Sequence, residues 1–96
     1  MITVKNLLSM GYRILDNEND KVYAKPVGLT LFVFDLNSDK ISNWFSSATT
    51  SKTMCDDSRK IKSLLELQGF EQYTQLHGAN NSKGFEFLSL EEQFEL

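Results

Sequence analysis

The sequence predicts an α+β domain in which an antiparallel sheet of about four to five strands packs against one main helix in two layers. Three observations predict this fold. Residues 12–25 alternate between apolar and polar on either side of a polar stretch, which indicates a β-hairpin. Residues 29–36 are apolar on both alternating faces, as in the central strand of a sheet. Apolar residues at helical spacing over residues 58–68 indicate the main helix.

The chain begins with a short predicted helix over residues 4–10. Thr3 is a good N-cap, Ile2 and Leu7 are spaced to form a hydrophobic staple, and Gly11 ends the helix. The predicted hairpin follows, with strands over residues 12–15 and 21–25.

A bend at Pro26-Val27-Gly28 leads into the predicted central strand, residues 29–36. One face of this strand carries Leu29, Leu31 and Val33, and the other carries Phe32, Phe34 and Leu36. We expect both faces to be covered. The alternative is that the second face is an exposed binding surface.

After a turn at residues 37–40, Ile41–Ser46 is predicted as a further strand. Alternation makes Trp44 point away from Ile41, Asn43 and Phe45. The small polar residues 46–53 show no periodicity and are predicted as a loop.

The main helix is predicted over about residues 58–68. Asp56, Asp57 and Ser58 favour a helix start, and Gly69 is a natural C-cap. Residues 70–76 fit either a strand or a ragged helix end. A loop at 77–84, a last strand at 85–88 and a terminal helical turn capped by Ser89 complete the expected order.

Length and composition indicate one globular domain spanning residues 1–96, with 41% hydrophobic residues. No apolar run approaches the roughly 18 residues of a membrane span, and the first residues lack the pattern of a signal peptide. We therefore expect a cytoplasmic protein that does not bind membranes.

The sequence offers little catalytic chemistry. It has one Cys, Cys55, and one His, His77, so an intrachain disulfide is excluded, and a structural zinc site, which needs about four such ligands, lacks two. The adjacent carboxylates Asp56-Asp57 and Glu91-Glu92 are explained by a helix start and a solvated terminal turn. We expect no enzyme activity, no catalytic residues, no metal and no cofactor.

Charge is divided along the chain. Residues 1–62 carry nine Lys and Arg against seven Asp and Glu, whereas residues 63–96 carry Lys83 against six Glu. A basic strip of Arg59, Lys60 and Lys62 on the predicted helix suits a phosphate backbone. The pI of about 5.0 makes direct nucleic-acid binding the weaker interpretation.

The acidic C-terminal third instead suits a basic surface on another protein, because its glutamates are interleaved with aromatic side chains. A structural interpretation is that these glutamates only keep the surface hydrated, and that the one Trp only fills the core. The predicted partner-binding residues are Trp44, Glu86, Glu91, Glu92, Phe94 and Glu95.

The leading hypothesis is a small non-enzymatic inhibitor or adaptor. Size, acidity and Asn/Lys/Ile-rich usage are typical of phage or mobile-element proteins that block a host nucleic-acid-handling or defence protein, as anti-CRISPR proteins do. The alternative is a self-associating module whose homodimer face is formed by residues 29–36 and Trp44. The third hypothesis is a weak nucleic-acid binder that uses the basic strip. The expected oligomeric state is a monomer or a homodimer.

Overall fold

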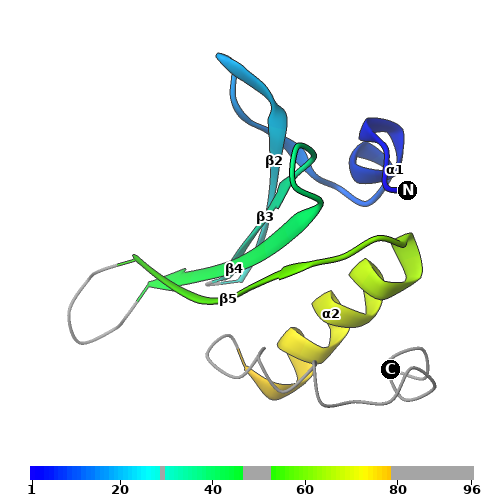
Figure 1. Cartoon of the computed structure of the whole chain (residues 1–96). Helices are drawn as coiled ribbons and strands as arrows, with labels where there is room; N and C mark the ends of the chain where they lie inside the picture. The colour runs from blue at the N-terminus through cyan, green and yellow to red at the C-terminus, as the bar shows by residue number, and fades with distance from the viewer. Residues whose placement is uncertain (29, 47–52, 79–96) are drawn as a thin grey trace.

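The computed structural model describes residues 1–28, 30–46 and 53–78. It shows a five-stranded antiparallel sheet with helices, which confirms the predicted α+β class (Figure 1). The elements in chain order are α1 (Val4–Ser9), β1 (Arg13–Asp16), β2 (Asn19–Val27), β3 (Thr30–Asp35), β4 (Lys40–Ser46), β5 (Thr53–Lys60) and α2 (Leu64–His77).

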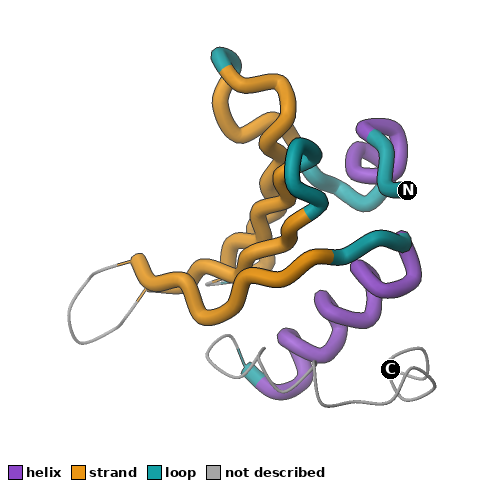
Figure 2. Tube along the Cα trace, viewed as in Figure 1, coloured by secondary structure: helices purple, strands orange, loops and turns teal. Residues whose placement is uncertain are grey.

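The strands lie in the sheet in their chain order, and each pairs with the next in antiparallel orientation. Figure 2 shows them as one layer, with short turns joining β1 to β2 and β3 to β4. This order confirms that the apolar segment containing β3 is the central strand. The predicted last strand at residues 85–88 lies outside the described residues, and β5 is the fifth strand.

The first helix forms as its capping signals predict. The Thr3 hydroxyl accepts a hydrogen bond from the Asn6 N–H, and the Asn6 side chain accepts one from the Thr3 N–H. Ile2 and Leu7, the expected staple pair, are both buried. Gly11 follows the helix with φ of 95°, a conformation that favours glycine.

The bend predicted at Pro26-Val27-Gly28 lies later than expected, because Pro26 belongs to β2 and is in register with Leu31. Register between β1 and β2 ends at Ala24, so the proline nitrogen, which has no hydrogen, faces no partner strand on that side. Gly28, with φ of 60°, begins the turn that follows.

The helix predicted over residues 58–68 is wrong in position. Residues 53–60 form β5, which is the outermost strand beside β4 among the described residues. The helix begins after Ser63, whose hydroxyl accepts a hydrogen bond from the Glu66 N–H. Gly69, the expected C-cap, is buried in the middle of α2, and residues 70–76 are helical. Pairing with β4 holds residues 53–60 in a strand, although Asp56, Asp57 and Ser58 are residue types that also favour a helix start.

The predicted basic strip is wrong for the same reason. Arg59 and Lys60 are neighbours in β5, so their side chains leave opposite faces of the sheet, and Lys62 lies in the connection to α2. No helix face in residues 53–78 therefore carries these three charges together.

One buried cluster holds the layers together. It takes Tyr23, Phe32, Phe34 and Ile41 from the sheet, and it adds residues from α1, α2 and the segments beside them: Ile2, Leu7, Tyr12, Ile61, Leu67 and Phe70. Both helices therefore pack on the same face of the sheet.

Candidate partner-binding surface

The sheet has a second face, on the side away from the helices in the described part of the chain. We call it the open face. Leu31 and Val33 belong to it because they alternate with the fully buried Phe32 and Phe34 along β3. They are only partly buried, which corrects the expectation that the central strand is fully covered on both sides.

Cross-strand register arranges the open face in rows, because residues in register point to the same face. A small row runs across the sheet through Ala24, Val33, Ser42 and Ser58, and it begins at β1 with Arg13. A large row lies one step along the strands and consists of Pro26, Leu31 and Trp44. On the other side of the small row lie Val22, Asp35, Lys40 and Lys60.

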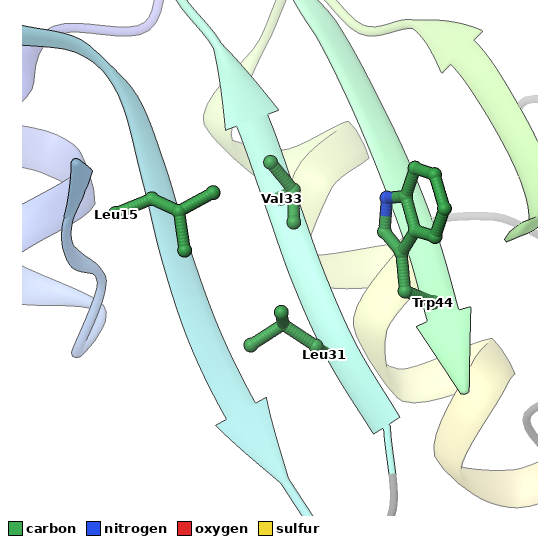
Figure 3. Close-up of a pocket in the computed structure, with 4 residues that line it drawn as sticks. All are labelled: Leu15, Leu31, Val33 and Trp44. Carbon is green, nitrogen blue, oxygen red and sulfur yellow. The ribbon is translucent and has the colours of Figure 1, made fainter. Parts of the chain in front are cut away.

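An apolar hollow of about 260 Å³ lies on this face and is lined by Leu15, Leu31, Val33 and Trp44. We call it the Trp44 hollow. Figure 3 shows Leu15 and Trp44 on its two sides, the β3 side chains between them, and α2 behind the sheet. Pockets for drug-sized ligands occupy about 300–1,000 Å³, whereas a cavity of about 150 Å³ accepts a benzene molecule. The Trp44 hollow therefore has the size and polarity for one or two apolar side chains.

On the covered face, a buried carboxylate connects three segments of the chain. Glu71 of α2 is 5% exposed. Its Oε2 accepts a hydrogen bond of 2.6 Å from the Tyr12 hydroxyl, and its Oε1 accepts one of 2.7 Å from Lys25 Nζ. Lys25 Nζ also lies 5.7 Å from the centroid of the Tyr12 ring. This Glu71 cluster fixes α2 against β2 and the residue that precedes β1, which is a structural role.

The Glu71 cluster makes stability depend on pH in alkaline solution. Burial, the negative charge of Glu71 and the hydrogen bond to Glu71 all raise the pKa of Tyr12 far above its usual value. In the unfolded chain this tyrosine ionises near the usual pKa of about 10, whereas in the fold it stays protonated. Above about pH 10 the unfolded state therefore binds fewer protons than the folded state. Rising pH then stabilises the unfolded state relative to the fold, so the free energy of unfolding falls.

We expect the wild type to lose about 1 kcal/mol more of its free energy of unfolding than Tyr12→Phe between pH 10 and pH 11, because the unfolded tyrosine goes from about one half to about nine tenths ionised. Urea unfolding at both pH values measures this difference, and Tyr12→Phe is the reference that cancels the titration of other groups. Equal losses in the two proteins would contradict the burial of a protonated Tyr12.

The predicted partner-binding residues divide into two groups. Trp44 is described and lines the hollow, pointing away from Ile41 and Asn43 as predicted. Glu86, Glu91, Glu92, Phe94 and Glu95 lie outside the described residues. Sequence reasoning missed Leu15, because its position between Ile14 and Asp16 gives no local signal of a binding site.

The two residues considered for catalysis belong to different elements. Cys55 lies in β5 in register with Trp44, and His77 is the last residue of α2, with its ring centroid 4.1 Å from that of Tyr73. Among residues 1–28, 30–46 and 53–78, no three His, Cys, Asp or Glu side chains gather closely enough to hold a metal ion. Within the same ranges, neither helix has the length and apolar character needed to cross a membrane.

No protein-family model, curated protein or solved structure matches the chain. The assignment of a candidate site therefore rests only on the geometry described above, an apolar hollow on the open face of a small α+β protein.

Proposed function

We propose that this chain is a non-enzymatic binding protein whose open face contacts another polypeptide. The Trp44 hollow carries the proposal: it is apolar, it has the volume of one or two side chains, and it includes the only Trp of the sequence. Tryptophan is enriched among the residues that dominate binding energy at interfaces. The occupant has apolar side chains, because an apolar lining offers no polar group to orient a charged ligand.

This proposal keeps the inhibitor or adaptor class expected from the sequence and gives it a described contact surface. The host-directed, phage-type role and the cytoplasmic location are proposed on composition alone. The acidic, aromatic-studded segment with Glu86, Glu91, Glu92, Phe94 and Glu95 is a second proposed contact, supported by its charge. The two contacts differ in salt dependence, because screening weakens exposed charge pairs and leaves apolar burial intact.

The test is a pull-down in which the tagged protein is immobilised and incubated with a bacterial lysate to which the untagged protein has been added. The experiment is carried out at low and at high salt. We expect the wild type to retain a polypeptide at both salt concentrations and Leu31→Lys to lose it, because the substitution places a charge on the floor of the hollow. Leu65→Lys is the matched control, since Leu65 is 62% exposed on α2. Circular dichroism checks that both variants fold.

Retention that Leu31→Lys leaves unchanged would contradict the open face as the contact surface. If that retention also disappears at high salt and in the triple variant Glu91→Lys, Glu92→Lys and Glu95→Lys, the acidic segment is the contact instead.

A further inference from the structure

We propose that the polypeptide on the open face is a second copy of this chain, so that two sheets pack face to face as a two-fold symmetric homodimer. The inference rests on the proposed function and identifies the partner of the same surface. It is carried by the arrangement of the rows, by the area of the face and by the position of its charges.

The open face is complementary to the open face of a second copy, because its large row can pack on the partner's small row. The large row and the small row are adjacent, one step apart along the same strands. A two-fold axis that runs across the strands, between these rows and midway between the sheets, places each row of one copy on the other row of its partner. Each strand then lies over the same strand of the partner, in the opposite direction.

This arrangement matches large side chains with small ones. Trp44 of each copy lies over Ser42 of the other, and Leu31 lies over Val33. Facing layers interdigitate when large residues oppose small ones, and aligned sheet packing keeps the strand directions within about 30° of each other. The Trp44 hollow is filled in this way by apolar side chains of the second copy.

The area of the face determines how much of it a stable dimer has to use. Five strands about 4.8 Å apart and about six residues long give a face of roughly 24 Å by 20 Å, or about 480 Å² in projection. Side chains project from the sheet, so the accessible area exceeds this projection, and each partner of a standard interface contributes roughly 800 Å². The hollow alone is much smaller than this, so a whole-face contact is required.

The charges lie where an interface tolerates them. Asp35, Lys40 and Lys60 are in register with one another, one step beyond the small row. Lys40 and Lys60 are exposed. Apart from the exposed Arg13 at the β1 end of the small row, the two central rows contain apolar residues and serine. Arg13 and the charged row both lie at the border of these rows, which is the pattern of an apolar interface core with a polar rim.

The first experiment measures the molar mass of the untagged chain by analytical ultracentrifugation from micromolar to millimolar concentration, together with Trp44 fluorescence. We expect the mass to double with concentration and the emission of this one Trp to move to shorter wavelength over the same range, because Trp44 becomes buried. Leu31→Lys and Val33→Asp are each expected to weaken association at least about 100-fold, because a charge is buried without a partner. Leu65→Lys is expected to associate as the wild type does.

The second experiment tests the register. Residue 31 of one copy faces residue 33 of the other, so a mixture of Leu31→Lys and Val33→Asp places the new lysine beside the new aspartate. We expect the mixture to form a heterodimer although neither variant associates alone. A mixture that stays monomeric, with both variants folded by circular dichroism, would overturn this packing of the rows.

A wild type that remains a monomer at millimolar concentration would overturn the inference. The proposed function would still stand if Leu31→Lys then loses a different polypeptide retained from the lysate. It would fail together with the inference if Leu31→Lys changes neither self-association nor retention.

Discussion

Phe70→Ala is expected to lower the free energy of unfolding by about 3–5 kcal/mol. Phe70 lies in α2 and is fully buried, with its ring centroid 6.0 Å from that of Phe32 and an angle of 74° between the rings. The substitution removes this edge-to-face contact and leaves a cavity between helix and sheet. A domain of this length has a total stability of about 5–14 kcal/mol, so the variant loses a large part of it.

Urea unfolding followed by far-UV circular dichroism measures the loss. Leu76→Ala is the matched control on the same helix, because Leu76 is 72% exposed and its removal should change stability by less than about 0.5 kcal/mol. A Phe70→Ala protein as stable as this control would contradict the packing of α2 on the face of Phe32 and Phe34.

Local patterns predicted the elements whose partners are close in the chain. Thr3 and Gly11 mark the ends of α1, and alternation over residues 12–25 marks the β1–β2 hairpin. Alternation along residues 41–46 likewise placed Trp44 on the face opposite Ile41. These signals are local, since capping bonds span three residues and hairpin strands pair across a short turn.

The boundary between β5 and α2 was mispredicted because two competing helix-start signals lie a few residues apart. Asp56, Asp57 and Ser58 are all favoured N-cap residues, yet all three lie in β5, and Asp57 and Ser58 pair with β4. The capping signal that operates is Ser63 with Glu66 three residues later, which fits the Ser-x-x-Glu pattern. Gly69 was mispredicted as the C-cap because glycine commonly follows the last turn of a helix, whereas here it lies inside α2.

The candidate site was predictable only in part. Period-two alternation places Leu31 and Val33 on one face of the predicted strand, and the sequence raised the alternative that the second face of this strand is an exposed binding surface. The sequence did not place Trp44 beside Leu31, because that depends on the register of β3 with β4. It did not reveal which face the helices cover, because that depends on the long-range packing of α2. The Glu71 cluster shows the same limit, since Tyr12 and Lys25 are 59 and 46 residues away from Glu71 in the chain.

The second large effect is expected at the Glu71 cluster, where Glu71→Leu should lower the free energy of unfolding by about 2–4 kcal/mol. The substitution leaves the Lys25 ammonium and the buried Tyr12 hydroxyl without their acceptor. The Lys25 side chain is 24% exposed, so it regains some hydration, and the loss stays below that of a fully enclosed ion pair.

Compensating substitutions separate the two parts of this loss. Adding Lys25→Met to Glu71→Leu should recover stability, because a buried ion pair costs desolvation energy that two apolar side chains avoid. Adding Tyr12→Phe as a third change should recover more, since it removes the remaining buried donor. Denaturant unfolding of the single, double and triple variants measures both steps. If the double and triple variants are successively less stable than Glu71→Leu, the three residues contribute independently and do not form one cluster that fixes α2 to the sheet.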